Sequence, residues 1–167
     1  MAYFKEIVTK AVIGKGKKTT KEKYKVFING GIDNVLGCWV INHLFSGSNI
    51  NGNVEVNGTF DVNIWYSYDN NTKTNVVIKT FSYNDLMKVR IKENSKLNSN
   101  SEIIVRALVQ PSVTDVQVIN GEVVLEIEKS NGVEVIGEVL MKVSVQDEFD
   151  DYEEIEEDID INENYLK

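Results

Sequence analysis

The chain has 167 residues, 42% of them hydrophobic, and a formal net charge of −8. That length suffices for one domain with its own apolar core. A single cysteine, Cys38, excludes an internal disulfide, and one Cys with one His cannot supply the ligands of a zinc site. No apolar run approaches the roughly 18 residues of a membrane helix, and no secretory signal is evident, so we expect synthesis in a reducing compartment.

The charge is divided between the two ends of the chain. Residues 1–25 carry eight lysines against two glutamates, whereas residues 147–167 carry eleven acids against one lysine. Opposite charges favour head-to-tail contact between copies or docking of each end on a different partner, although both ends could equally be solvated tails. The pI of about 4.8 opposes nucleic-acid binding by the lysine cluster.

The first residues have an ambiguous pattern. Phe4, Ile7, Val8, Ala11 and Val12 match helical spacing, whereas alternate residues from Ile7 to Ile13 match a strand. We predict a short helix or arm over residues 3–13, followed by a lysine-rich loop, GKGKKTTKEK. Residues 1–20 are therefore assigned to an N-terminal arm and basic loop, residues 21–146 to a β-sandwich body, and residues 147–167 to an acidic tail.

The body is predicted to consist of β-strands. In residues 53–68, NVEVNGTFDVNIWYSY, apolar side chains occupy one parity from Val54 to Tyr68 and polar side chains occupy the other, with Gly58 expected to bend the strand. Residues 133–145 repeat the alternation, and Ser130-Asn131-Gly132 is expected to be a turn before them. The predicted strands are 24–29, 35–45, 53–68, 74–81, 103–109, 113–118, 122–128 and 133–145. Seven or eight strands at this spacing predict an all-β antiparallel sandwich or a partly open barrel.

The sequence contains no convincing arrangement of catalytic residues. Cys38 and His43 are five residues apart in one predicted strand, and this odd spacing places them on opposite faces, which argues against a Cys/His dyad. His43 is predicted to be a hydrogen-bonded core or interface residue. GKGK at 14–17 lacks the spacing of a phosphate loop. We expect no catalytic, cofactor-binding or metal-binding residue, and hence no enzyme.

Two tryptophans lie on strand faces that the alternation predicts to be exposed to solvent. Trp65 shares the polar parity of the long strand with Asn63, and Trp39 shares a parity with Ile41, His43 and Phe45 in the apolar run 35–45. Such faces are covered either by another sheet of the same molecule or by another chain. The candidates for self-association are Trp39, Ile41, His43, Phe45 and Trp65.

The acidic tail has too many charges to pack alone, so it is predicted to be disordered in isolation. Its apolar residues Phe149, Tyr152, Ile155 and Ile159 are three, three and four positions apart. A helix formed on a partner would display them on one edge. They are the candidates for partner docking.

Several segments carry a resemblance to a known family. VLGCWVINHLF at 35–45, VEVNGTFDVNIWYSYDNNTKT at 54–74, VQPSVTDVQVINGEVVLEIE at 109–128 and the acidic ending resemble CotE, the morphogenetic protein family of the outer spore coat. The similarity covers nearly the whole chain and includes FKEIVTKAVIGKGKK at the N-terminus.

The resemblance implies a structural role without catalysis. It implies synthesis in the mother-cell cytoplasm, attachment to a basement-layer protein of the coat, self-assembly on the forespore surface, and recruitment of outer coat client proteins. It assigns recruitment to residues 147–167 and self-association to the preceding part of the chain. A layer needs one closed contact and one contact that does not close, so we expect a cyclic oligomer such as a trimer that is linked onward. A ligand-binding β module for glycan or peptide on the Trp65 face is the alternative.

Overall fold

The computed structural model describes residues 3–145, and within them every regular element is a β-strand. The strands are β1 (Tyr3–Phe27), β2 (Asn34–Ile50), β3 (Asn53–Tyr68), β4 (Lys73–Met87), β5 (Arg90–Ile91), β6 (Glu102–Ile119) and β7 (Glu122–Val145). The all-β prediction is confirmed. The predicted tail lies outside the described residues.

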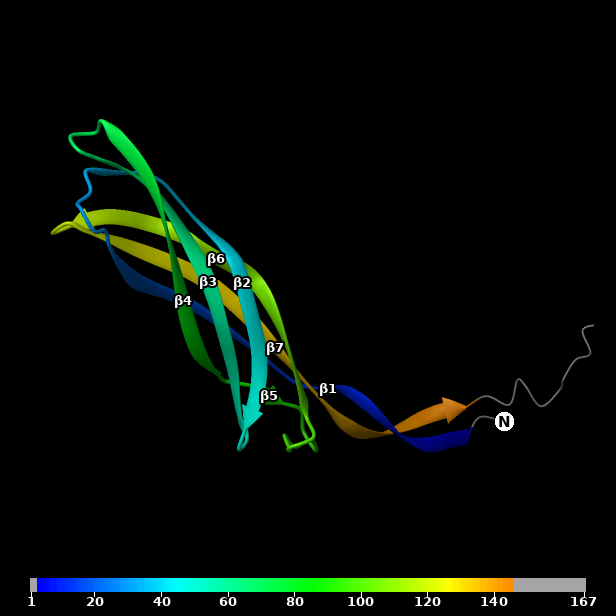
Figure 1. Cartoon of the computed structure of the whole chain (residues 1–167). Coiled ribbons are helices and arrows are strands. Elements are labelled where there is room, and N and C mark those ends of the chain that lie inside the picture. The colour runs from blue at the N-terminus through cyan, green and yellow to red at the C-terminus, as the bar shows by residue number, and fades with distance from the viewer. Residues whose placement is uncertain (1–2, 146–167) are drawn as a thin grey trace, which may run out of the picture. The chain divides into compact units, whose positions relative to one another are not determined.

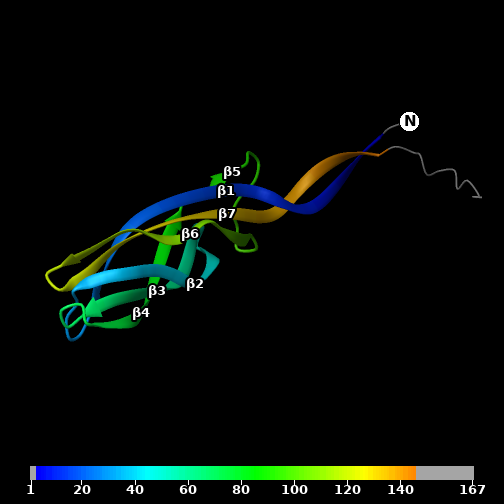
Figure 2. The ribbon, with the colours of Figure 1, turned by 90° about the horizontal axis from the view of Figure 1, so that it is seen from above.

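The strands form two sheets. One has the order β5-β1-β7-β6 and the other β2-β3-β4, and no closed barrel is formed within residues 3–145. The chain divides into a unit of residues 10–139 and a second unit, of which residues 3–9 and 140–145 are described. In the unit 10–139, the two sheets face each other across one core, as Figures 1 and 2 show.

The alternation predicted for the long strand is confirmed. Val54, Val56, Phe60, Val62 and Ile64 of β3 are buried, with Phe60 0% exposed. β3 is the central strand of its sheet and pairs antiparallel with both neighbours. One face of this strand therefore supplies the floor of the core.

Aromatic rings connect the two sheets. Tyr24 of β1 meets Phe60 edge-on, with ring centroids 5.6 Å apart, and lies 4.6 Å from Phe81 of β4. Such pairs contribute roughly 0.5–1.5 kcal/mol each beyond their buried area. Burial raises the pKa of Tyr24, and the hydrogen bond that its hydroxyl donates to Glu22 raises it further.

Gly58 makes room for the ring of Tyr83 on the neighbouring strand. The register of β3 with β4 runs through Gly58 without a shift, and Gly58 lies opposite Tyr83. A Cβ at position 58 would overlap the ring of Tyr83. The strand therefore has no bulge at this position, and the glycine is needed because the ring of Tyr83 crosses the strand there.

The N-terminal helix and the lysine-rich loop were wrong predictions. Both segments belong to β1, which pairs with β7 along the sheet and with β5 at Gly14 and Lys15. Between Gly14 and Phe27, even positions turn inward, as Tyr24 and Val26 do, and odd positions carry exposed lysines. This is the alternation of a strand with one solvent-exposed face. The many lysines made the segment resemble a polar loop in the sequence.

The predicted turn at Ser130-Asn131-Gly132 is also wrong, because β7 continues through it. Ser130 and Asn131 are buried, and the hydroxyl of Thr19 on β1 donates a hydrogen bond of 3.0 Å to Ser130. Farther along the strand, Val133 and Val135 are buried as expected, whereas Met141 and Val143 are exposed.

β6 is likewise one strand where two were predicted. The register with β7 shifts across Pro111, between Val109 and Ser112, and also before and after it, between Ala107 and Val109 and between Val113 and Asp115. Proline cannot donate a ladder hydrogen bond, and a bulge at the edge of a sheet accommodates it.

Because Phe60 is buried and Trp39 is half exposed, replacing each by alanine is expected to change the free energy of unfolding by different amounts. Phe60→Ala removes a fully buried ring and is expected to lower the free energy of unfolding by about 3–5 kcal/mol. Trp39, at 45% exposure, is not core, so Trp39→Ala is expected to cost about 1 kcal/mol or less in the dilute protein. Urea unfolding of both variants measures this difference, and equal losses would contradict the assignment of faces.

Candidate interaction surfaces

A bulge in β2 decides which of its side chains face outward. Asn42 has φ of 56°, and the register with β3 shifts between Ile41 and Leu44. Trp39 and Ile41 are therefore exposed on the outer face, whereas His43 and Phe45 turn inward. The expected single face for these four residues is wrong, because an extra residue reverses the alternation.

The outer face of β2-β3-β4 carries an apolar surface that we call the tryptophan face. Three cross-strand rows build it: Gly37–Trp65–Val76, Trp39–Asn63–Ile78 and Ile41–Asp61–Thr80. Its exposed apolar residues are Trp39, Ile41, Trp65, Val76 and Ile78. Residues directly opposite one another in antiparallel strands share a face, so these side chains form one contiguous patch.

The two indoles converge over Gly37. A Cβ at Gly37 would lie 3.5 Å from Trp39 and 3.6 Å from Trp65. Trp65 is 43% exposed. Exposed tryptophans gathered on a sheet face are typical of a surface that another molecule covers.

The one carboxylate in these rows, that of Asp61, is held by neighbouring side chains. Thr80 donates a hydrogen bond of 2.6 Å to one Asp61 oxygen, and Asn42 donates one of 3.0 Å to the other. These bonds, that from Thr80 first, lower the pKa of Asp61. The charge therefore sits at the border of the tryptophan face, in a polar cluster made possible by the bulge.

Asn63 lies in the middle of the tryptophan face. It is only 4% exposed, because Trp39 and Ile78 flank it across the sheet. Its side-chain amide makes no hydrogen bond within residues 3–145, yet it is not among the fully buried atoms there that lack a partner, so it keeps contact with solvent. A polar group in such a position favours contact with a ligand or partner that can hydrogen-bond.

His43 is hydrogen-bonded on the inner side, which confirms that part of its prediction. Its Nε2 lies 2.6 Å from the hydroxyl of Tyr83, and its Nδ1 lies 2.9 Å from Oε1 of Gln110 on β6. Asn131 of β7 donates a further hydrogen bond of 3.1 Å to the Tyr83 hydroxyl. This polar chain joins both sheets next to the aromatic core.

A buried ion pair lies beside this network. Nζ of Lys129 is 3.1 Å from Asp85, donates a hydrogen bond to Thr20, and lies 4.1 Å from the centroid of the Tyr83 ring. The side chains of Lys129 and Asp85 are 3% and 7% exposed. Loss of Asp85 would leave the buried charge of Lys129 without its carboxylate, whereas Asp85 also has Lys18 of β1 at 4.0 Å, so these charges hold β1, β4 and β7 in one arrangement.

Cys38 and His43 face the same interior, and not opposite faces as their odd spacing predicted, because the bulge at Asn42 lies between them. No hydrogen bond joins the two side chains in the described part of the chain. Burial raises the pKa of Cys38 to about 11, so its thiol is protonated at neutral pH. The arrangement is that of a packing cysteine.

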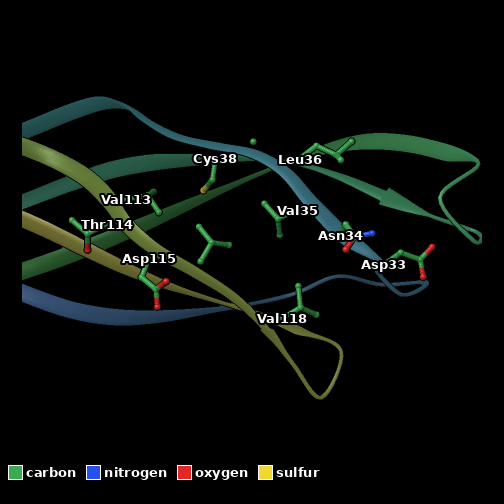
Figure 3. A pocket seen from close by; sticks show the side chains of 11 residues that line it. Asp33, Asn34, Val35, Leu36, Cys38, Val113, Thr114, Asp115 and Val118 are labelled. Carbon is green, nitrogen blue, oxygen red and sulfur yellow. The ribbon is translucent and has the colours of Figure 1, made fainter.

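An open groove of about 650 Å³ lies between the edges of β2 and β6. Figure 3 shows Val35 and Cys38 of β2 on one side, with Val113 and Asp115 of β6 on the other. The groove exists because β2 and β6 are edge strands of different sheets and no ladder closes the space between them. Its lining has two carboxylates, Asp33 and Asp115, and no histidine.

Residues 3–145 contain no group of three or more His, Cys, Asp or Glu side chains placed to hold a metal ion. They also contain no helix that is long and apolar enough to cross a membrane. The docking candidates Phe149, Tyr152, Ile155 and Ile159 lie outside the described residues.

Sequence reasoning missed part of the tryptophan face. Val76 and Ile78 complete it from β4, and the predicted strand 74–81 contained both, but their register with Asn63 and Trp65 was not visible. The pair Lys129–Asp85 was missed as well, because each residue looks like an ordinary surface charge. A lysine or aspartate at the inward parity of a strand is the signal that could have found it.

The single histidine makes one prediction simple to measure. Burial, the largest effect, lowers the pKa of His43 below its ordinary value of 6.5, which the hydrogen bond with Gln110 opposes. The neutral imidazole therefore stabilises the fold above pH 6.5, and this stability is lost as the pH falls through the lowered pKa. The one histidine Hε1 resonance in an NMR titration is expected to have its midpoint below 6.5. A midpoint above 6.5 would contradict the structure.

The comparisons with known proteins give one result. The family model described as outer spore coat protein E (CotE) matches residues 3–167, nearly the whole chain. A search of curated proteins found no match. The chain belongs to the CotE family of outer spore coat proteins.

Proposed function

We propose that this protein is a structural scaffold of the outer spore coat, which self-assembles around the forespore and recruits other coat proteins without catalysing a reaction. The tryptophan face is the observation that carries the proposal. Five exposed apolar side chains form one patch on the sheet β2-β3-β4, and the nearby carboxylate of Asp61 is engaged by Thr80 and Asn42.

A second copy of the chain is the occupant that suits this face. Interface cores are depleted in charged residues and enriched in tryptophan. Contacts between copies must be compatible with a closed ring, and an apolar patch whose one carboxylate, Asp61, lies at its border can meet a surface of the same chain with little repulsion. The proposed product is a cyclic oligomer such as a trimer, formed in the mother-cell cytoplasm.

Recruitment is assigned to other parts of the molecule. The family resemblance assigns client capture to residues 147–167, and the basement-layer protein of the coat is the proposed anchor. A non-enzymatic role agrees with the chemistry of the interior, where the thiol of Cys38 is held protonated and His43 is engaged by Tyr83 and Gln110. The scaffold acts through its surfaces.

Removing both indoles tests the self-association surface. Trp39→Ala with Trp65→Ala is expected to weaken association by about 2 kcal/mol or more per tryptophan, roughly thirtyfold each in Kd, because buried tryptophans are typical interface hot spots. Mass is measured by light scattering after size exclusion over a range of concentrations. Ile119→Ala, which truncates an exposed residue of β6, is the matched control.

The proposal fails if the double variant assembles like the parent protein. It also fails if the parent is monomeric at high concentration. Circular dichroism and urea unfolding establish in each case that the variant is folded, as the exposure of both tryptophans leads us to expect.

A glycan is the second candidate occupant of the same face. Asn63 favours it, since its amide lies opposite Trp39 and two residues from Trp65, where it could hydrogen-bond a sugar hydroxyl while the rings stack on the sugar. Glycan-array binding that is lost in Trp65→Ala, with assembly unchanged, would select this function over the scaffold contact.

Client capture is tested separately. Deletion of residues 147–167 is expected to leave the fold and the closed oligomer intact, because the described core lies within residues 10–139. The same deletion is expected to abolish retention of coat proteins in a pull-down from sporulating cells. Normal retention by the truncated protein would contradict a docking role for the tail.

A further inference from the structure

The exposed lysines of β1 form a regular column on one face of the strand. The lysine column consists of Lys17, Lys21, Lys23 and Lys25, all exposed and all at odd positions. Phe27 continues the same parity at 71% exposure. Even positions of this stretch face the core, where Tyr24 packs on Phe60. The side chains are therefore displayed as one basic row that ends in an aromatic ring.

The backbone beside this column is an unpaired sheet edge. β1 lies between β5 and β7, but β5 covers only Gly14 and Lys15. Beyond Lys15, no strand of the described part of the chain is paired with that edge. Free amide and carbonyl groups on an edge strand are a template for an added strand, which natural proteins either block or use.

Only part of the charge of the column is compensated within the molecule. Lys21 lies 3.5 Å from Glu126 of β7, and that carboxylate also accepts a hydrogen bond from Thr114. Lys17, Lys23 and Lys25 form no ion pair within residues 3–145. The column therefore offers positive charge to an acidic partner along its free edge.

The chain itself contains a segment with the complementary pattern. Residues 154–161 read EIEEDIDI, so the even positions 154, 156, 158 and 160 are all acidic, and Ile155, Ile159 and Ile161 are odd. If these residues were extended, one face would carry four carboxylates and the other three isoleucines with Glu157. The spacing of the carboxylates in such a strand equals that of Lys21, Lys23 and Lys25.

We propose that residues 154–161 of one copy add as a β-strand to the free edge of β1 in a neighbouring copy, with their acidic side chains against the lysine column. This proposal rests on the proposed scaffold function. The added strand would be the contact that links closed oligomers into a layer. Residues 16–27 offer twelve positions, enough for the eight residues 154–161 but not for the whole tail. Residues 147–153, with Phe149 and Tyr152, remain for client proteins.

Zero-length carbodiimide cross-linking tests the contact in the full-length protein. Equal amounts of ¹⁴N- and ¹⁵N-labelled protein are mixed, cross-linked and digested, and mass spectrometry identifies the joined peptides. Cross-links between residues 17–25 of one isotope and residues 154–161 of the other are expected, and their yield is expected to fall with added salt. Absence of these cross-links, or cross-links within single copies only, would overturn the proposal.

Charge reversal gives an independent test. The triple variant Lys21→Glu, Lys23→Glu, Lys25→Glu is expected to weaken linking of oligomers about tenfold, because three cross-strand charge pairs become repulsive. The variant Glu156→Lys, Asp158→Lys, Asp160→Lys is expected to do the same. A mixture of the two is expected to restore linking, since the acidic tail of the first meets the lysine column of the second.

A matched control carries the same change of net charge elsewhere. Lys79→Glu, Lys92→Glu, Lys96→Glu replaces three exposed lysines outside β1 and is expected to link normally. If this control is equally impaired, or the mixture fails to recover, the specific contact is refuted. Light scattering of the same samples gives the mass of the closed oligomer. If linking is lost but the closed oligomer persists, only the tail contact is affected. If the closed oligomer itself is absent, the contact through the tryptophan face has failed, and with it the scaffold proposal.

Discussion

The burial of one face of β3 is the constraint on which the rest of the structure depends. Val54, Val56, Phe60, Val62 and Ile64 are removed from water together, and their burial requires a second sheet above them. Because side chains alternate, the same strand must present Asp61, Asn63 and Trp65 on its other face. The core and the tryptophan face are thus two consequences of one strand.

Polar and charged groups fix how the two sheets meet. The buried pair Lys129–Asp85 and the chain from the exposed Gln110 through His43 and Tyr83 to the buried Asn131 connect strands of both sheets beside the apolar core. Apolar packing alone tolerates many arrangements, whereas a buried charge such as that of Lys129 needs an opposite charge beside it. These contacts hold the inner faces together and so keep the outer faces of both sheets free for other molecules.

Sequence reasoning predicted the β class, the inward face of β3 and the position of Trp65, because alternation in a long strand is a strong signal. It failed where one residue changes the parity, as at Asn42, and where many lysines hide a strand, as in β1. Strands joined across Pro111 and across residues 130–132 were divided because proline and Asn-Gly resemble turns locally. Partners across the sheet, such as Ile78 beside Asn63, depend on a register that one sequence does not reveal.

Both tryptophans of the chain, Trp39 and Trp65, lie on the face assigned to contact between copies. Their intrinsic fluorescence therefore reports that face and no other. The account predicts that the emission maximum moves to shorter wavelength and acrylamide quenching falls as rising concentration drives assembly, in parallel with the mass from light scattering. Growth in mass with unchanged emission and quenching would show that the copies meet elsewhere and would contradict the central claim.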